Sequence, residues 1–514
     1  MIRELELGLL DGGYTRQPGF VYGIDVPRFR DSDGDGFGDF EGVIEKLEYV
    51  ASLGASWIWL LPFYRSLRRD NGYDVDDHRS IDPRIGDMRT FERLIDAAHA
   101  LGLRVMLDFI VHHTSDRHTW FRASADGDPH YRDFYVWRDE PIPPAIDPPM
   151  FPGEEASVWR YSGVRGAWYR HGFYRFEPDL NHDEPGVREE LYQVAEFWVD
   201  HGVDGFRVDA APHVTEEGEV ALSFFDGLRF RLEKRKPGVV LIAEADVPPA
   251  GAVPMLAERR FDAILDFFLN NRLALGLARE DARPIADGVG QLASTRPSAW
   301  INFVRNHDEL DLEQLSDAER QEVFDRFAPD HGMRLYERGV RRAWAPLMET
   351  DERLRLSLSL LFALPGWPLI MAGQELGMGE DLALPARNAV RLPMQWHPSP
   401  DDAGMPRHFL RDVQREGRHG VAVANAVRAN EDPDSLANLI RSLTAIRATR
   451  SAVEASALPG GDPSPVLVLR CRGITAVHNL GGERLDVALR LGSHLLGPYT
   501  GGAIGPYEWG WFAA

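Results

Sequence analysis

The runs GFRVDA (205–210), VVLIAEA (239–245) and FDAILDF (261–267) decide the fold, because they follow one another as short apolar segments of strand length. Segments with helical periodicity, such as MRTFERLIDAAHALG (88–102), separate several of these runs. Five more runs complete the set: VYGIDV (21–26), ASWIWLLP (55–62), LRVMLDFI (103–110), SAWINFVRN (298–306) and PLIMAGQE (368–375). Alternating strands and helices indicate a parallel sheet, and eight units predict an α/β fold of the closed (β/α)8 type, the TIM barrel.

Two regions depart from this alternation. Residues 114–186 are rich in Trp, Tyr, Pro, Gly and Asp, and we interpret them as a lobe inserted after the third strand, where barrel enzymes build specificity. From residue 458 onward, Pro and Gly residues separate runs in which apolar and polar side chains alternate, a pattern typical of a small antiparallel β domain. We therefore expect a barrel at 1–113 and 187–457, an inserted domain at 114–186 and a C-terminal β domain at 458–514.

The charge of the chain excludes several classes of partner. Among 514 residues, 80 Asp and Glu oppose 57 Lys and Arg, which gives a net charge of −23. A field of this sign repels nucleic acids and anionic membranes, so a neutral or cationic small molecule is the expected partner. Cys471 is the only cysteine, which excludes an intramolecular disulfide and gives secretion no support. The sequence indicates no oligomeric state.

No segment is predicted to target the chain to a membrane or out of the cell. The first 13 residues mix charged and apolar side chains without the apolar core of a signal peptide, so we expect a cytoplasmic protein. Residues 356–373 (LSLSLLFALPGWPLIMAG) carry no charge and approach the length of a membrane span. Because Pro365, Gly366 and Pro368 interrupt them, we predict a buried helix, a turn and a buried strand instead.

Three carboxylates follow the apolar runs. Asp209 closes the fourth predicted strand, Glu244 closes the fifth, and Asp308 follows the seventh within RNHDEL. A single Asp after a strand is more often a helix cap or a surface acid, but three at strand ends converge on the same mouth of a barrel. Such a set suits glycosidic cleavage with retention, in which one carboxylate attacks the anomeric carbon and a second, protonated one serves the leaving oxygen. The third can bind sugar hydroxyls more tightly in the transition state.

Three further side chains are expected at the same mouth. Arg207 lies two positions before Asp209, so both side chains point to the same side of the strand and the arginine can hold the carboxylate ionised. His113 ends the third strand, and His307 precedes Asp308. A histidine at a strand end is more often a plain hydrogen-bonding residue than a catalytic one, but neutral imidazoles suit sugar hydroxyls.

The loop DSDGDGFGD (31–39) is a candidate metal site. Its acids, Asp31, Asp33, Asp35 and Asp39, stand mostly at alternate positions with glycines between them. Hard oxygen ligands at this spacing suit Ca²⁺, which we expect in a structural role, without an organic cofactor. The loop is not an EF-hand, because its twelfth position is a glycine rather than a bidentate Glu. The alternative is an acidic turn.

The segments GFRVDAAPH, LIAEA, FVRNHD and DFIVHH resemble the conserved regions of glycoside hydrolase family 13, the α-amylase family, in order and spacing. FEPDLN (176–181) resembles its fifth signature, and DNGYDV (70–75) resembles the segment that builds its glucose pocket. The resemblance spans nearly the whole chain. It implies that Asp209 is the nucleophile, Glu244 the general acid/base and Asp308 the transition-state stabiliser. It also implies a sugar subsite lined by Asp70, Tyr73, His113, Arg207 and His307, and a Ca²⁺ ligand from the Phe37 carbonyl.

Within this family, the runs RNHDELDLEQLSDAERQEVF, LGMGEDL and RNAVRLPMQW are most similar to trehalose synthases, which interconvert maltose and trehalose. PMQW is shared with oligo-1,6-glucosidases, where a nearby arginine closes the glucose pocket; Arg391 is the first candidate and Arg387 the alternate. The resemblance implies a small α-glucoside substrate in a closed pocket. The chain departs from the family where it has His112 in place of asparagine and Glu177 in place of the commoner glutamine.

Three functions are compatible with these residues. We expect maltose and trehalose interconversion, in which glucose released from a glycosyl-aspartate rotates and returns through its anomeric hydroxyl. The alternative is hydrolysis by an α-glucosidase or a small-substrate amylase, because water competes for the same intermediate. A remote alternative is a non-catalytic binding protein on this fold. Such relatives usually carry a membrane anchor and degraded acids, which this sequence lacks.

Overall fold

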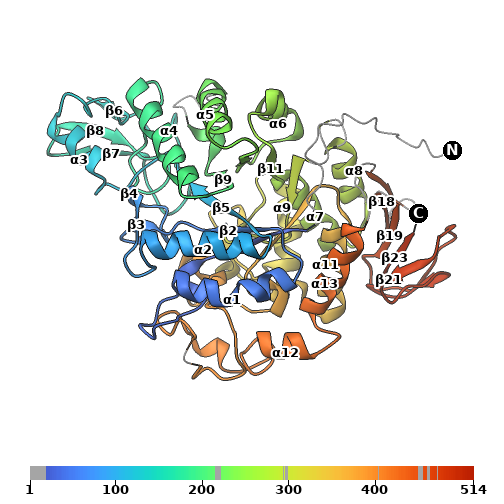
Figure 1. The fold of residues 1–514 in the computed structure, drawn as a ribbon. Coiled ribbons are helices and arrows are strands. Elements are labelled where there is room, and N and C mark those ends of the chain that lie inside the picture. The colour runs from blue at the N-terminus through green and yellow to red at the C-terminus, as the bar shows by residue number, and fades with distance from the viewer. Residues whose placement is uncertain are drawn as a thin grey trace.

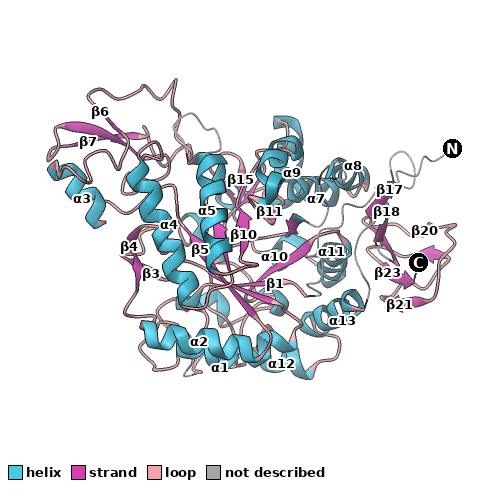
Figure 2. Cartoon of the chain, turned by 45° about the horizontal axis from the view of Figure 1, so that its top comes forward, coloured by secondary structure: helices cyan, strands magenta, loops and turns pink. Residues whose placement is uncertain are grey.

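Eight parallel strands close into a barrel at the centre of the molecule (Figures 1 and 2). The computed structural model describes residues 19–513, apart from 215–221, 293–294, 296–298, 403, 450–454, 460–463 and 472. The barrel strands are β1 (Val21–Ile24), β2 (Trp57–Leu60), β5 (Arg104–Phe109), β9 (Gly205–Val208), β10 (Val240–Ala243), β11 (Ala263–Leu265), β12 (Trp300–Asn302) and β16 (Trp367–Met371). They pair in this order, and β16 returns to β1. All eight predicted strands are confirmed, whereas the first 13 residues, on which the localisation was argued, lie outside the described residues.

Helices surround the barrel because helical segments follow its strands, and several of these helices begin at a side-chain N-terminal cap. Asp39 caps the first helix by accepting a hydrogen bond from Gly42 N at 2.7 Å, and Asp87 caps the second through Thr90 N at 2.8 Å. The longer helices are α1 (Phe40–Ser52), α2 (Met88–Ala100), α4 (Pro185–Asp200), α5 (Leu222–Arg235), α6 (Pro249–Leu256), α7 (Phe267–Arg279), α8 (Arg283–Leu292), α9 (Asp317–Phe327), α11 (Asp351–Ala363) and α13 (Leu436–Ala448). Two shorter ones are α10 (Trp344–Met348) and α12 (Ala426–Glu431).

The barrel interior is a packed core rather than a channel. Trp57 and Trp59 of β2 lie inside it among apolar side chains from the other strands. Two glycines make room for this packing, since a Cβ on Gly205 would lie 2.7 Å from the Val240 carbonyl oxygen and one on Gly23 would lie 2.5 Å from the Met371 side chain. The strands are buried on both faces, which explains why they appear in the sequence as continuous apolar runs.

The uncharged segment 356–373 is part of this barrel. Its first half belongs to α11, the chain turns at Gly366 with φ 91°, and its second half contains β16. Arg447 donates to the Gly366 carbonyl at 2.7 Å and so fixes the turn. The predicted buried helix, turn and strand are therefore confirmed, and the described part of the chain contains no helix long and apolar enough to cross a membrane.

A lobe is inserted between β5 and α4, as the sequence predicts (Figure 1). It contains α3 (Thr119–Asp126) and a three-stranded sheet of β6 (Trp137–Arg138), β8 (Ala167–Arg170) and β7 (Trp159–Ser162). Arg170 joins two acids of this lobe, Asp147 at 2.9 Å and Asp179 at 2.6 Å. Smaller sheets are the pair β3 (Tyr64–Ser66) with β4 (Val75–Ile81), and the set β13 (Leu310–Asp311), β15 (Gly339–Val340) and β14 (Arg334–Leu335).

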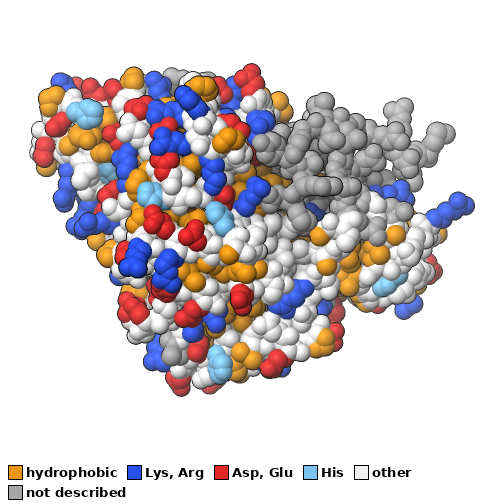
Figure 3. Space-filling model, in the orientation of Figure 1, with side chains coloured by type: hydrophobic (Ala, Val, Ile, Leu, Met, Phe, Trp, Pro, Cys, Tyr) orange, Lys and Arg blue, Asp and Glu red, His pale blue; other side chains and the backbone are white. Residues whose placement is uncertain are grey.

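The C-terminal part is an antiparallel β structure that lies beside α11 and α13 (Figure 2). Its five-stranded sheet has the order β17 (Ala455–Pro459), β18 (Val466–Cys471), β19 (Ile474–Asn479), β23 (Trp509–Ala513) and β21 (His494–Leu496), and β20 (Leu485–Asp486) pairs with β22 (Ala503–Ile504). Trp511 donates to Ser359 Oγ on α11 at 2.9 Å. The first strand begins at Ala455, slightly before the predicted boundary at 458. On the face in Figure 3, side chains of both signs are interspersed, so the net charge is not gathered there in one acidic patch.

Trp198 of α4 tests the packing between helix and barrel. Its buried ring contacts Phe63 and Phe91 at centroid distances of 5.4 and 5.1 Å, and its indole N–H donates to the His78 carbonyl at 2.9 Å. We expect Trp198→Ala to lower the free energy of unfolding by about 3–5 kcal/mol, because a cavity replaces the ring. Phe230→Ala on α5, where the ring is 70% exposed, is the control and should change it by less than about 0.5 kcal/mol. Equal effects in a denaturant titration would contradict this packing.

Candidate active site

The carboxylates of Asp209 and Glu244 meet at one end of the barrel, immediately after β9 and β10. Arg207, on β9 and almost completely buried, holds both of them. Its Nη1 lies 2.6 Å from Asp209 Oδ1, and its Nη2 pairs with Glu244 Oε1. Ala210 turns into the left-handed region (φ 45°), and its N–H donates to Glu244 Oε2 at 3.0 Å. The predicted alternation along β9 and the convergence of these two acids are therefore present.

Asp108, near the end of β5, is a third acid that binds the Arg207 guanidinium, and it was not predicted from the sequence. It accepts from Arg207 Nη1 at 2.5 Å and from the Tyr73 hydroxyl at 2.9 Å. Asp108 and Arg207 are register partners across β5 and β9, so their side chains lie on the same side of the sheet. The available signal was an acid within an apolar strand, in the segment DFIVHH. The register that gives it a partner could not be read from the sequence.

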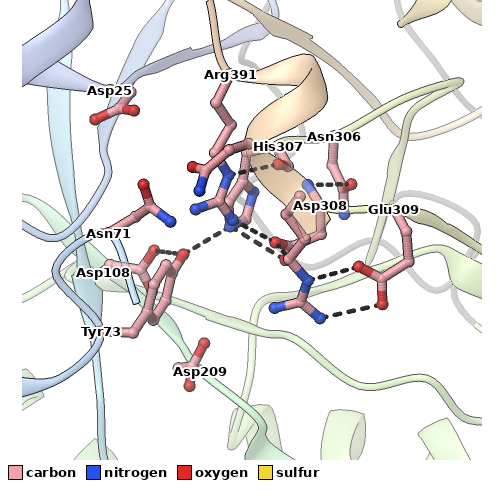
Figure 4. A network of polar contacts seen from close by, with 12 residues as sticks. Asp25, Asn71, Tyr73, Asp108, Asp209, Asn306, His307, Asp308, Glu309 and Arg391 are labelled. Carbon is pink, nitrogen blue, oxygen red and sulfur yellow. Dashed lines mark hydrogen bonds and ion pairs between the residues drawn. The ribbon is translucent and has the colours of Figure 1, made fainter. Parts of the chain in front are cut away.

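Asp308 lies across the pocket in a second network (Figure 4). Arg391 Nη2 donates to Asp308 Oδ1 at 2.6 Å, and His307 Nε2 lies 3.3 Å from Asp308 Oδ2. The Tyr73 hydroxyl is 2.7 Å from the same imidazole nitrogen, and the two rings stack at 5.9 Å. Because the Tyr73 hydroxyl donates to Asp108, it accepts from His307 Nε2–H, which fixes the imidazole as a donor. Tyr73 thus connects the two networks.

Both candidate arginines contact Asp308. Arg391 binds it directly and also donates through Nε to the His307 carbonyl at 2.9 Å. Arg387 Nε lies 3.4 Å from Asp308 Oδ1, but its main partner is Glu309, which it binds with both Nε and Nη2 at 2.6 and 3.1 Å. His307 and Arg391 also line a cavity of about 80 Å³ beside the pocket, at the end of β1.

Asp70 and His113 complete the predicted set from other sides. Asp70 interacts electrostatically with Arg387, Arg391 and Asp308, so it faces the second network. His113 is buried in a different wall, where its Nε2 lies 3.8 Å from Glu177 Oε1. Burial raises the pKa of Asp70 to about 6, although the two arginines oppose the shift, and burial lowers the pKa of His113 to about 4. His113 is therefore a neutral hydrogen-bonding group.

The three strand-end acids have different protonation behaviour. Burial raises the pKa of Glu244 to about 7 and that of Asp209 to about 6, while Arg207 opposes both shifts. Burial also acts on Asp308, but Arg387, His307 and Arg391 outweigh it and hold the pKa of Asp308 below its usual range. Near neutral pH, the pocket thus combines a carboxyl group that can carry a proton with two that are ionised. That combination suits acid–base and nucleophilic work at a glycosidic bond.

Aromatic side chains from distant segments meet beside Arg387. Phe151 of the inserted lobe stacks on Tyr336 at 4.4 Å, and the Tyr336 hydroxyl lies 2.8 Å from that of Tyr174. The Arg387 guanidinium lies over the Phe151 ring at 4.9 Å. We call Phe151, Tyr174 and Tyr336 the aromatic roof. It joins the inserted lobe to the segment after α9, a contact that was not predicted from the sequence.

The loop at 31–39 brings three of its four acids together. Oxygens of Asp31, Asp33 and Asp39 all lie within 4.8 Å of one another. Backbone N–H groups of Gly34 and Gly36 donate to the two oxygens of Asp31 at 2.7 and 2.9 Å, and so hold that carboxylate in place. Asp35 does not join the group; its carboxylate accepts from the backbone N–H of Phe37 at 2.8 Å. The three grouped acids offer the hard oxygen donors that Ca²⁺ prefers.

Comparison with known proteins is consistent with this geometry. Residues 24–275 match the model of the alpha amylase catalytic domain. The trehalose synthase/amylase TreS of Mycolicibacterium smegmatis is 36% identical over 492 residues, which cover 91% of this chain and 82% of that protein. The chain belongs to the α-amylase family, glycoside hydrolase family 13. It is therefore a glycosidase or transglucosidase of this family, with trehalose synthases among its relatives.

Two solved structures have the same overall fold. The α-amylase of H. orenii has a TM-score of 0.78 at 25% identity, with 96% of this chain and 99% of that one covered. The trehalulose synthase MutB of Pseudomonas mesoacidophila MX-45 also has a TM-score of 0.78, at 24% identity, with 98% and 100% covered. One is named as an amylase and the other as a synthase. The fold alone therefore does not separate hydrolysis from isomerisation.

The substitution Asp108→Asn tests whether Asp108 influences Asp209 at the Arg207 guanidinium that both acids share. The Asp108 charge raises the pKa of Asp209, so its removal should lower that pKa and move the acidic limb of the kcat/KM profile to lower pH. We also expect kcat to fall on the order of tenfold, because Arg207 loses one of its anchors. The measurement is kcat/KM for an α-glucoside against pH. Asp330→Asn, at an exposed site, is the control, and an unshifted acidic limb in Asp108→Asn would contradict the coupling.

Proposed function

We propose that this chain is a retaining transglucosidase that interconverts maltose and trehalose through a glycosyl ester on Asp209. The observation that carries the proposal is the joint attachment of Asp209 and Glu244 to Arg207, with Asp308 held apart by Arg391. The first arrangement places an ionised carboxylate beside one that carries a proton. The second arrangement keeps Asp308 ionised, across the pocket from Asp209 and Glu244.

Each group has a distinct task in the proposed reaction. An Asp209 oxygen attacks the anomeric carbon while Glu244 gives its proton to the leaving glycosidic oxygen, so one C–O bond forms as the other breaks. Glu244 then takes a proton from the incoming hydroxyl as the glycosyl ester is cleaved. Asp308, with Arg391 and His307, is placed to bind sugar hydroxyls, which strengthens binding as positive charge develops on the ring. Asp70, Tyr73 and His113 would hold the same glucosyl unit.

The aromatic roof supports isomerisation over hydrolysis. A covered pocket keeps the released glucose close to the intermediate and limits access of water, which competes for the same ester. The relative from M. smegmatis is named both as a trehalose synthase and as an amylase, so hydrolysis remains the second candidate. The expected substrate is a small α-glucoside. The cytoplasmic location stays a prediction.

Product analysis with maltose separates the two candidates. We expect trehalose to form in larger amount than free glucose, with both quantified by chromatography over the time course. Asp209→Ala should lose activity by about 10⁴-fold or more, because the nucleophile is absent. Glucose without trehalose would establish the hydrolytic alternative. Asp330→Asn serves as a control for expression and handling.

We also propose that the loop at 31–39 binds a structural Ca²⁺ through Asp31, Asp33 and Asp39, with the Phe37 carbonyl as a further ligand, whereas Asp35 lies outside this group. The grouping of three carboxylates with no arginine or lysine recorded as an ion-pair partner of them, within the described residues, supports a cation there. The loop leads directly into α1 through the Asp39 cap, so the ion would stabilise the start of the first helix. It stands apart from the three strand-end acids.

Chelation tests the metal proposal through stability. Removal of Ca²⁺ with EDTA should lower the melting temperature, and added Ca²⁺ should restore it, because an ion that binds only the folded state stabilises it by mass action. In Asp33→Asn the response should weaken or vanish, whereas Asp330→Asn should respond as the wild type does. An EDTA-insensitive melting temperature in the wild-type protein would contradict the proposal.

A further inference from the structure

Glu177 is a completely buried acid beside His113, one of the residues that we assign to the sugar subsite. It lies in the segment FEPDLN (176–181), which leads from the inserted lobe toward α4, and its exposed fraction is 0%. Its Oε2 accepts a hydrogen bond from the backbone N–H of Tyr174 at 3.3 Å. Among the residues that the structure describes, its Oε1 has no hydrogen-bond partner. One oxygen of this carboxyl group is thus buried without a hydrogen bond from the described part of the chain.

Apart from the Tyr174 N–H, which lowers the pKa of Glu177, the charged groups around this residue oppose a negative charge on it. Asp70, Asp74 and Asp209 act on it electrostatically, each raising its pKa. The imidazole of His113 lies 3.8 Å from Oε1, is buried and is itself neutral at ordinary pH. The cations of this region are engaged elsewhere: Arg69 pairs with Asp74 and Asp116, and Arg170 with Asp147 and Asp179. Within the described part of the chain, no arginine or lysine forms an ion pair with Glu177.

Burial and these acids together favour the neutral form of Glu177. A buried carboxylate without a cation loses its hydration and gains no compensating partner. Burial, followed by Asp70 and Asp74, therefore raises the pKa of Glu177 well above its usual range. A neutral carboxyl group carries one O–H donor besides its acceptor oxygens. His113 lies beside it, and neither of its ring nitrogens has a hydrogen bond of ordinary geometry within the described residues.

We propose that Glu177 is a substrate-binding residue that acts as a neutral carboxylic acid, donating its O–H to a hydroxyl of the glucosyl unit next to His113. The proposal rests on the proposed function, because it assigns a sugar to this pocket. It also explains how the chain tolerates an acid where the family commonly has glutamine. A neutral carboxyl group and a carboxamide have similar shape, and both offer a donor.

This assignment makes sugar binding depend on pH. Below the folded-state pKa of Glu177, the donor is present; as pH rises through that pKa, the proton leaves. The ionised group then lacks its donor and adds a negative charge beside Asp70 and Asp209. The apparent Kd for sugar should therefore rise at alkaline pH, by about tenfold for each pH unit above the pKa, as the competent fraction falls.

Two substitutions separate hydrogen bonding from charge. Glu177→Gln keeps a donor and cannot ionise, so the alkaline rise in the Kd of glucose should disappear. Glu177→Leu keeps much of the volume but has no polar atom, so it should bind glucose about two- to tenfold more weakly than Glu177→Gln at every pH. The measurement is isothermal titration with glucose from pH 5.5 to 9, and KM for maltose over the same range. Recovered binding in Glu177→Gln relative to Glu177→Leu supports the donor role.

Glu375 provides the matched control. It is also completely buried, and burial raises its pKa to about 6, but its Oε1 accepts from the hydroxyls of Tyr22 and Tyr49 at 2.8 and 3.1 Å, outside the glucose pocket. Glu375→Gln should leave the alkaline rise in the glucose Kd as it is in the wild type. A rise that vanished in this control as well would show a general effect of buried acids and would overturn the proposal.

A measurement without sugar tests the protonation separately. Because the pKa of Glu177 is higher in the folded than in the unfolded state, the wild-type protein loses stability as pH rises above the unfolded value, and Glu177→Gln does not. The melting temperature of Glu177→Gln should exceed that of the wild type by a margin that grows with pH. A constant difference, or an unchanged alkaline rise in the glucose Kd of Glu177→Gln, would overturn this inference alone. Failure of the wild type to bind glucose or cleave maltose would overturn the proposed function, and this inference with it.

Discussion

The buried guanidinium of Arg207 is the constraint on which the pocket floor depends. It neutralises acids on three neighbouring barrel strands, Asp108 within β5, Asp209 after β9 and Glu244 after β10. Without a cation, three carboxylates at this distance could not share a buried site, because repulsion and lost hydration would protonate them or push them apart. Parallel register places Arg207 beside Asp108, and strand alternation places it on the side of Asp209. The barrel thus determines the charge state of the floor as well as its shape.

The second network combines side chains that follow barrel strands with side chains from the loops. His307 and Asp308 follow β12, Tyr73 comes from the segment between β3 and β4, and Arg391 lies far along the chain after β16. A single hydroxyl, that of Tyr73, connects this network to Asp108. Rotation or loss of that ring would therefore disturb acids on both sides of the pocket. Positioning here depends on contacts between segments that lie from 35 to 234 residues apart in the sequence.

Much of the fold could be predicted from the sequence because burial on both faces gives strands a continuous apolar pattern. All eight barrel strands were found in this way, and the acids at their ends followed from the general location of chemistry in such barrels. The role of Asp108 was not predicted because its partner is defined by strand register. The role of Glu309 was not predicted because its partner, Arg387, lies 78 residues away. Asp35 was expected among the metal ligands by spacing alone, whereas its carboxylate turns to the Phe37 N–H instead. Local sequence patterns thus predict the helices, the strands and the residues at the strand ends. They do not predict the side-chain partners, which depend on tertiary packing.

The aromatic roof has a consequence for how enzymes of this kind diversify. Phe151, Tyr174 and Tyr336 lie on loops, and the acids of the floor lie at strand ends that the barrel core holds rigidly. Substitutions in the roof can therefore accumulate without a penalty in barrel stability and without loss of the bond-breaking machinery. Changes in the roof can therefore alter which acceptor molecule reaches the intermediate, while the residues that form the intermediate stay the same. In such a molecule, a new product spectrum is a smaller evolutionary step than a new reaction.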